Sequence, residues 1–490
     1  MRKKLSVLHP VLLAVLFLLP AATVHATNGM NLEGYGPIAT GMGGASMAYD
    51  NGTAAMMNNP ATLGLMPEGD RLDVALGFLG PHITASAPGA PDAKSSADAF
   101  YMPAVGLVKK SGPVAYGVGV FAQGGMGAEF DANSFLAAGS GDKVRSELGV
   151  ARLLFPVAYE VNKNFIIGGS IDYVRATLDL KMALSGPQFL DMVGSFGGSE
   201  KYGSASGSMI NAFGGFFAAG GLNPANPVNW GRFDFSDDSP FSGKAEGEGF
   251  AGKIGAVYKV TDALTVGATY HSKTHLGSLD ATGATVTFNA NVDQGFITTG
   301  TPNGTYAPMK IPVSGNISVK DFQWPQMIGA GMAYQASDKL LLVFDYKWIN
   351  WKDTMKDFKM TFSANQSQAG LAQGFAGTGL DATLVQNWKD QNVFMLGAGY
   401  RATDDLTLRV GANLSNNPIP DTYMNPLFPA IIKNHYMVGA GYMITKASSV
   451  DASFTYAPEV KATTGPDPMG NQVTIAHSQS NAQLMYSYRF

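Results

Sequence analysis

The feature that most constrains this 490-residue chain is a period-two alternation of apolar and polar side chains in segments of about ten residues. In the final eight residues, QLMYSYRF, the apolar and aromatic side chains share one face, namely Leu484, Tyr486, Tyr488 and Phe490. The same alternation recurs in the segments LTLRVGANLS, LTVGATYHSK, SVDASFTYAP and YMVGAGYMIT. Successive side chains of a β-strand point to opposite faces. The pattern therefore predicts strands with one lipid-facing and one water-facing side.

Strands of this kind favour an all-β transmembrane antiparallel β-barrel. After residue 27, no apolar run reaches the roughly 18 residues that a membrane-spanning helix requires. Only a closed sheet pairs all its backbone polar groups in lipid, and an aromatic last residue is typical of such barrels. A soluble β-sandwich or propeller is the alternative, but its outward faces would be charged, and only 14% of this chain is charged.

Short polar connections give a strand count. Six segments predict tight periplasmic turns, and they are KKSGPV (109–114), VNKNF (161–165), VTDAL (260–264), ASDKL (336–340), ATDDL (402–406) and ITKASS (444–449). Each joins two alternating segments. With one strand beginning near Arg71 and one ending at Phe490, we expect about 14 strands in a barrel over 70–490. The long connections should be extracellular, at 84–98, 124–143, 186–243, 286–310, 362–384, 416–430 and 459–473.

The N-terminus predicts export. MRKK is a positively charged start, VLLAVLFLLP is an apolar run, and VHA supplies small residues before a cleavage site after Ala26. Residues 1–26 are therefore expected to be a signal peptide rather than an uncleaved anchor. The formal net charge of −4 implies no basic surface for nucleic acid, and the absence of cysteine excludes a disulfide or a thiolate metal site.

Residues 27–69 precede the first expected strand and are rich in glycine and small side chains. A barrel of about 14 strands leaves an open lumen unless something fills it, so we expect this segment to be an N-terminal hatch inside the barrel. In the stretch MMNNPATLGLM, Pro60 lacks a backbone donor and has a fixed φ, and Asn59 can bond local backbone. The turn would hold the hatch in one conformation. The alternative is a turn that only separates a helix from a strand.

The long connection 186–243 contains MINAFGGFFAAGG. Met209, Phe213, Phe216 and Phe217 approximate helical spacing, and an apolar patch on an extracellular loop indicates a binding site. A lid folded over the barrel mouth is the alternative, and the two interpretations are compatible.

The stretch NNPATLGLM, with Asn59, Pro60 and Ala61, resembles the Asn-Pro-Ala hatch motif of FadL-type outer-membrane channels for long-chain fatty acids and aromatic hydrocarbons. Because NPAN recurs at 223–226, the tripeptide alone is weak. The resemblance rests on a combination that covers nearly the whole chain: the glycine-rich lead, GGMGAEF after the third expected strand, a long third loop, NNPIPD (416–421) and the aromatic C-terminus.

The resemblance implies a monomeric channel in the bacterial outer membrane, surrounded by lipid, that takes up hydrophobic small molecules by passive diffusion. It implies a ligand groove at Phe213, Phe216 and Phe217. It also implies a lateral hole at a kink in the third strand, where Gly124 and Gly125 stand, and glycine within a strand often marks a bulge. A general water-filled porin is the main alternative, followed by a surface adhesin or a barrel hydrolase. We assign no catalytic residue, cofactor or metal ligand.

Candidate cations for a fatty-acid carboxylate come from alternation and from the resemblance together. Alternation turns Arg152, Lys273 and Lys359 into the lumen, and Lys359 matches a ninth-strand lysine of the family. Each is equally well explained as the partner of a nearby carboxylate. In the fatty-acid channels, an arginine stands in the upper part of the fifth strand. The matching position in this chain is near Leu180, and the adjacent Lys181 lies on the opposite face. This difference puts fatty-acid specificity in doubt.

Overall fold

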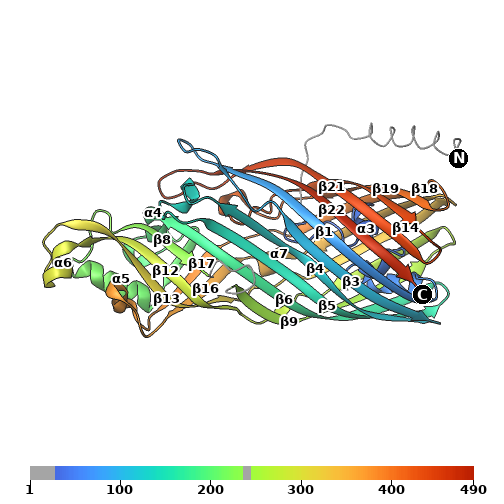
Figure 1. Cartoon of the computed structure of the whole chain (residues 1–490), viewed down its shortest axis with the longest axis horizontal. Helices are drawn as coiled ribbons and strands as arrows, with labels where there is room; N and C mark the ends of the chain where they lie inside the picture. Colours follow the sequence, from blue (N-terminus) through green and yellow to red (C-terminus); the bar gives the residue numbers. More distant parts are fainter. Residues whose placement is uncertain (1–27, 236–243) are drawn as a thin grey trace.

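The computed structural model describes residues 28–235 and 244–490, so the expected signal peptide lies outside the described residues. Within these two ranges the strands form a single sheet of 22 strands. None of the described helices is long and apolar enough to cross a membrane. Figure 1 shows long tilted strands at one end and shorter strands with helices α5 (Ser208–Ala218) and α6 (Gln294–Thr299) at the other.

The sheet closes on itself. β1 (Gly69–Ser86) pairs with β3 (Phe100–Ser111) on one side and with β22 (Thr474–Arg489) on the other. We call the closed circuit of antiparallel strands the barrel wall, and in spatial order it is β1, β3, β4 (Val114–Phe130), β5 (Val144–Asn162), β6 (Phe165–Ser185), β9 (Ala245–Lys259), β10 (Leu264–His271), β14 (Met327–Ser337), β15 (Leu340–Ile349), β18 (Gln391–Arg401), β19 (Leu406–Ser415), β20 (Asn434–Met443), β21 (Ser448–Thr463) and β22. The prediction of a closed antiparallel barrel is confirmed.

The six predicted turns each join neighbouring strands of the barrel wall. The predicted connections 286–310 and 362–384 were too short, because further strands lie above the wall. These extra strands form an extension of the sheet and are β7 (Gly203–Ser206), β8 (Val228–Asp234), β12 (Leu279–Asp293), β13 (Tyr306–Lys320), β16 (Asp357–Ala364) and β17 (Gly379–Val385). Two further strands of two residues each, β2 (Ala93–Lys94) and β11 (His275–Leu276), pair with β1 and β9. The whole described sheet therefore has more strands than the expected 14, since alternation does not distinguish a strand in lipid from one above it.

The outer face of the wall carries exposed apolar side chains, including Leu76, Val118, Val157 and Ile254. Aromatic side chains from neighbouring strands meet on this face. Their ring centroids are 5.8 Å apart for Phe78 and Tyr101, 5.8 Å for Tyr173 and Phe250, and 5.2 Å for Tyr346 and Phe394. An outward apolar band flanked by aromatic residues is the arrangement that lipid stabilises.

Residues 28–66, which we call the N-terminal segment, are almost entirely buried and contain α3 (Pro37–Thr40), η1 (Gly52–Met56) and η2 (Pro60–Leu65). The segment touches strands all around the wall: α3 packs on β20 and β21, η1 on β1 and β3, and η2 on β5, β6 and β9. Several wall glycines allow its backbone to come close. A Cβ at Gly267 would lie 1.9 Å from the Met47 carbonyl oxygen, and one at Gly411 would lie 2.0 Å from the Gly43 nitrogen. The high glycine content thus has a packing role.

Candidate functional site

The pairing of β3 with β4 stops before either strand ends. Their last paired residues are Ala104 and Phe121, whereas β4 continues to Phe130 along β5. Farther up, the backbone of Ser96 donates to the Glu129 carbonyl at 2.8 Å, and the Ser96 hydroxyl donates to the Glu129 carboxylate at 2.9 Å. Between these contacts the wall lacks a ladder. We call this gap the window.

A β-bulge lies at the lower edge of the window. On β5, Ala151 pairs with Ala122 and the next residue, Val150, pairs with Gly124, so Gln123 is an extra residue in β4. Gly124 and Gly125 directly follow it. A Cβ at Gly124 would lie 2.1 Å from the Met30 carbonyl oxygen, and one at Gly125 would lie 2.1 Å from that of Leu148. Only glycine fits at these two positions.

A cavity of about 730 Å³, the wall cavity, occupies the window. This volume is in the range of pockets that hold small molecules. Inward-facing residues such as Ile83, Val150 and His477 line it, and so do outward-facing residues such as Tyr101 and Thr177. Residues from both faces of the wall therefore contribute to the lining of this cavity.

The outer rim of the wall cavity carries charged side chains that have ion-pair partners. It carries Glu129, Arg145, Glu147 and Arg175. Arg145 forms ion pairs with Glu147 and, at 3.8 Å, with Glu129, while Arg175 pairs with Glu246 at 2.5 Å. These two arginines are the cations that line this cavity within the described residues, and neither lacks a carboxylate partner.

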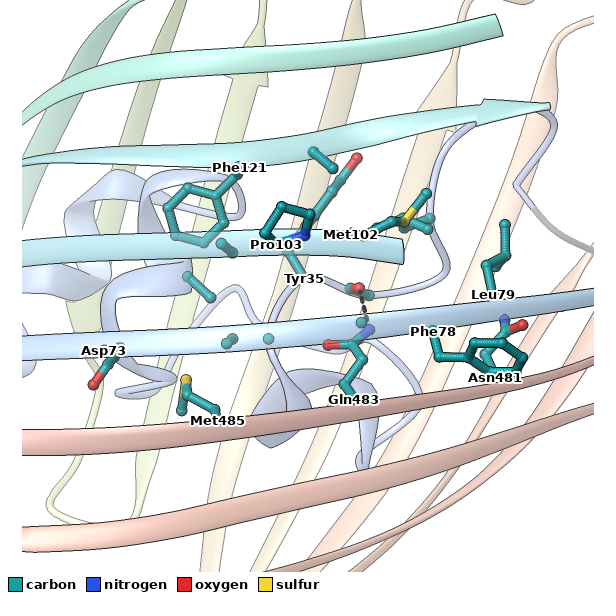
Figure 2. A pocket seen from close by; sticks show the side chains of 18 of the residues that line it. Tyr35, Asp73, Phe78, Leu79, Met102, Pro103, Phe121, Asn481, Gln483 and Met485 are labelled. Atoms are coloured by element: carbon teal, nitrogen blue, oxygen red, sulfur yellow. Dashed lines mark hydrogen bonds between the residues drawn. The ribbon is translucent and has the colours of Figure 1, made fainter. Parts of the chain in front are cut away.

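A smaller cavity of about 40 Å³ adjoins the wall cavity, since Leu79, Met102 and Ala122 line both. Figure 2 shows its lining from β1, β3, β4, β22 and the N-terminal segment, with Phe121 of β4 above and Gln483 of β22 below. Gln483 donates to the Gly34 carbonyl at 3.3 Å. The N-terminal segment thus forms one wall of the space next to the window.

A third cavity, of about 480 Å³, lies among the loops above the wall, and we call it the mouth cavity. Its lining includes Phe135, Met182, Tyr423 and Leu427. The connection 416–433 separates it from the wall cavity, because Leu427 faces the mouth cavity whereas Pro429 and Ala430 line the wall cavity. The Ser146 hydroxyl donates to the Leu427 carbonyl and helps to fix this connection.

The Asn-Pro-Ala tripeptide begins η2. The Asn59 side chain accepts from the Ala61 backbone at 3.1 Å, and its amide donates to the Met47 carbonyl at 2.8 Å and to the Ala256 carbonyl of β9 at 3.2 Å. Pro60 stands at the first helical position, where no donor is needed. Asn59 therefore joins two parts of the N-terminal segment to the wall.

Other polar contacts fix the same segment. On β15, the Asp345 carboxylate accepts from the backbone of Ser46 at 2.5 Å and of Met47 at 3.0 Å. On β1, Asp73 accepts from the Thr53 backbone at 2.7 Å. Such charge-assisted bonds to backbone are about twice as strong as neutral ones.

Phe213, Phe216 and Phe217 lie on α5, as their spacing predicted. Phe213 is only 1% exposed. Its ring centroid is 6.1 Å from Phe189, 5.8 Å from Phe196 and 5.7 Å from Phe288. Phe216 and Phe217 are half-buried. None of the three lines the wall, small or mouth cavity.

The structure does not bring Arg152, Lys273 and Lys359 together. Arg152 is inward-facing and buried. Lys273 lies after β10 and donates to Asp353 at 2.8 Å, a hydrogen bond that lowers the pKa of Asp353 below its usual range. Lys359, expected to face inward, is exposed on β16 of the extension. Alternation placed it incorrectly because that strand is not part of the barrel wall.

Lys181, which lies on the face opposite Leu180, is also buried. Because Leu180, Lys181 and Met182 are all buried, both faces of β6 are covered at this height. Sequence analysis did not single out Gln123, Arg145 or Tyr35. The only signal for Gln123 was the break in alternation before Gly124 and Gly125.

Comparisons with known proteins agree with this architecture. A family model described as outer membrane protein transport protein (OMPP1/FadL/TodX) matches residues 18–490. The toluene transporter TodX of P. putida has a TM-score of 0.76 and 27% identity, over 94% of this chain and 99% of that one. The toluene transporter TbuX of Ralstonia pickettii has a TM-score of 0.71 and 29% identity over the same shares.

Outer membrane protein P1 of Haemophilus influenzae is 24% identical over 208 residues, which are 42% of this chain and 38% of that protein. The chain spans only about a third of the length of the curated relatives it matches.

Proposed function

We propose a function from the premise that this chain belongs to the outer membrane protein transport family (OMPP1/FadL/TodX) and lies in the bacterial outer membrane. The chain is a channel that carries uncharged hydrophobic molecules from outside and releases them sideways into the membrane through the window. The observation that carries this proposal is the wall cavity, which has lining residues on both faces of the wall.

The proposal that the ligands are uncharged follows from the ion pairing of the cations near the path. Arg145 and Arg175 at the wall cavity are ion-paired, as are Arg152, Lys273 and Lys359 elsewhere. A carboxylate moving through this path would leave water without gaining a free counter-charge, and burying an unpaired charge is costly. A neutral hydrocarbon has no such cost and gains about 0.8 kcal/mol for each buried CH₂. The relatives TodX and TbuX, both named as toluene transporters, support the same class.

The proposed route passes through the mouth cavity. Its aromatic and methionine lining suits ligands of varied shape, because the thioether side chain is flexible. Phe216 and Phe217, half-buried on α5, are proposed as the first apolar surface that a ligand meets. The connection 416–433 would then admit the ligand to the wall cavity.

The N-terminal segment is proposed as a hatch that blocks passage to the periplasm. Its burial and its bonds to β1, β9 and β15 support this role. With the hatch in place, a ligand in the lumen has the window as its way out.

A disulfide tests whether the hatch must move. The chain has no cysteine, so a Thr53→Cys/Gly106→Cys pair would form a unique bridge between η1 and β3. A Cβ at residue 106 would lie 2.5 Å from the Thr53 Cβ. The two Cβ atoms therefore need to move only slightly apart to reach the distance of about 3.8 Å that is usual between the Cβ atoms of a disulfide. We expect uptake of toluene to be the same with the bridge oxidised or reduced, and each single variant serves as control. Uptake that appears only on reduction would place the exit at the hatch instead.

The substrate class is tested with matched pairs in cells that produce the channel. Uptake of toluene should exceed that of benzoate, and uptake of decane that of decanoate, by about tenfold or more at neutral pH. Cells without the channel give the background. Equal channel-dependent uptake of a hydrocarbon and its carboxylate would contradict the uncharged class without affecting the route.

A further inference from the structure

The bulge at Gln123 is held from both sides. On the N-terminal side, the Tyr35 hydroxyl donates to the Gln123 carbonyl at 2.6 Å. On the wall side, the Arg152 guanidinium donates to the Gln123 side-chain oxygen. Tyr35, Gln123 and Arg152 are all at least nine-tenths buried. The one residue that breaks the β4 ladder therefore has its backbone and its side chain fixed by different parts of the molecule.

Arg152 is itself fixed by a relay along the inner wall. Its guanidinium donates to Asp172 on β6 at 2.7 Å, and the same carboxylate accepts from Lys253 on β9 and from the Ser170 hydroxyl at 2.6 Å. The relay spans the neighbouring strands β4, β5, β6 and β9. Both cations of the relay contact Asp172, and Arg152 also contacts Gln123, so the relay fixes the position of Gln123.

The bulge marks a change in the pairing of β4. Above it, β4 pairs with the N-terminal segment instead of β3: the Gly125 backbone donates to the Met30 carbonyl at 3.1 Å, and Asn31 forms a bridge with Gly124. A bulge bends its strand and interrupts the ladder. If β4 kept the register that pairs Ala104 with Phe121, its next residues would run beside Pro103 and Met102 and close the window.

We propose that Tyr35, Gln123 and Arg152 are positioning residues that keep the window open, and that Tyr35 couples the opening to the seated N-terminal segment. The expected effect on transport rests on the proposed lateral exit, whereas the expected effect on the pairing of β3 and β4 does not. We call these three residues the Gln123 clamp. None of them lines the wall cavity or the mouth cavity, and Tyr35 lines only the small cavity beside the window.

Deleting Gln123 is the sharpest test. The deletion leaves the pairs Ala122–Ala151 and Gly124–Val150 directly successive, and therefore restores a regular β4–β5 ladder without turning any other side chain to the opposite face. We expect β3 and β4 to pair through the window. Hydrogen exchange should show additional slowly exchanging amides in residues 100–102 and 122–129, and toluene uptake should fall at least tenfold.

Tyr35→Phe removes only the hydroxyl, so it tests the clamp without changing the chain length. The matched control is Tyr49→Phe: the Tyr49 hydroxyl donates to the Ala45 carbonyl at 2.6 Å, and this equally buried bond lies within the N-terminal segment, away from the bulge. We expect Tyr35→Phe to lower toluene uptake about fivefold, the effect of one net hydrogen bond, and Tyr49→Phe to leave it unchanged.

The outcomes separate the two proposals. Unchanged amide exchange at 100–102 and 122–129 in a folded Gln123 deletion would overturn the clamp, whatever its uptake. Equal uptake by the Tyr35→Phe and Tyr49→Phe variants would overturn the coupling through Tyr35. New amide protection with undiminished uptake would support the clamp and contradict the lateral exit.

Discussion

At the scale of single residues, burial separates cations that look alike in the sequence. Arg152 and Lys359 each pair with an aspartate, at 2.7 Å and 3.2 Å. The Arg152 side chain is 3% exposed and its partner Asp172 is fully buried, whereas the Lys359 side chain is 48% exposed. Exposed pairs contribute little to stability because water screens them, whereas breaking a buried pair leaves a charge without compensation.

The variant Arg152→Met should destabilise the barrel by about 1–3 kcal/mol, because it removes the donor to the buried Gln123 side chain while Asp172 keeps its contact with Lys253. Lys359→Met is the matched control and should change stability by less than about 1 kcal/mol. The measured quantity is the temperature at which heating shifts the protein on a gel from the mobility of the folded barrel to that of the unfolded chain. Equal shifts for the two variants would show that Arg152 is not part of a buried network.

At the scale of elements, α5 shows how a helix above the membrane has a buried face and a partly exposed face. Phe213 points into a group of rings with Phe189, Phe196 and Phe288, whereas Phe216 and Phe217 are only half-buried. The group joins α5 to α4 (Gly186–Asp191), to η4 (Gly194–Phe196) and to β12 of the extension.

Phe213→Ala should loosen this group of loops, because replacing a buried phenylalanine by alanine costs about 3–5 kcal/mol. Limited proteolysis should then cut within residues 186–235 faster than in the unmodified protein. Phe217→Ala is the control, since that side chain is already partly exposed. Faster cleavage of the Phe217 variant than of the Phe213 variant would contradict the assignment of Phe213 to the packed face.

At the scale of the whole molecule, the barrel wall and the N-terminal segment fit together through glycine. Wall glycines on several strands, including Gly106, Gly168, Gly255 and Gly397, would clash with the segment if they carried a Cβ. The segment is therefore packed against backbone on many sides. Loss of this contact would leave a lumen large enough for water and ions.

Deletion of residues 28–66 should convert the protein into an open pore. Planar-bilayer recordings should show a large, steady ion conductance for the deletion variant and little for the unmodified protein. The folded state of the variant is checked by its gel mobility before heating. A comparable conductance in the unmodified protein would instead favour the water-filled porin.

The sequence by itself determined the barrel wall, because the information is local. Alternation along each strand, the six polar turns and the final Phe490 depend only on near neighbours in the chain. The same locality explains the helix at Phe213 to Phe217, where the spacing of apolar residues is enough.

Only the tertiary structure decided the window and the roles of the charges. A single extra residue at Gln123 interrupts the ladder, and neither its Tyr35 nor its Arg152 partner is near it in the sequence. Whether a lysine such as Lys359 faces the lumen depends on which strands close the circuit, and alternation is the same inside the circuit and above it. Long-range pairing of strands and side chains settled both points, because those contacts join residues that no local pattern connects.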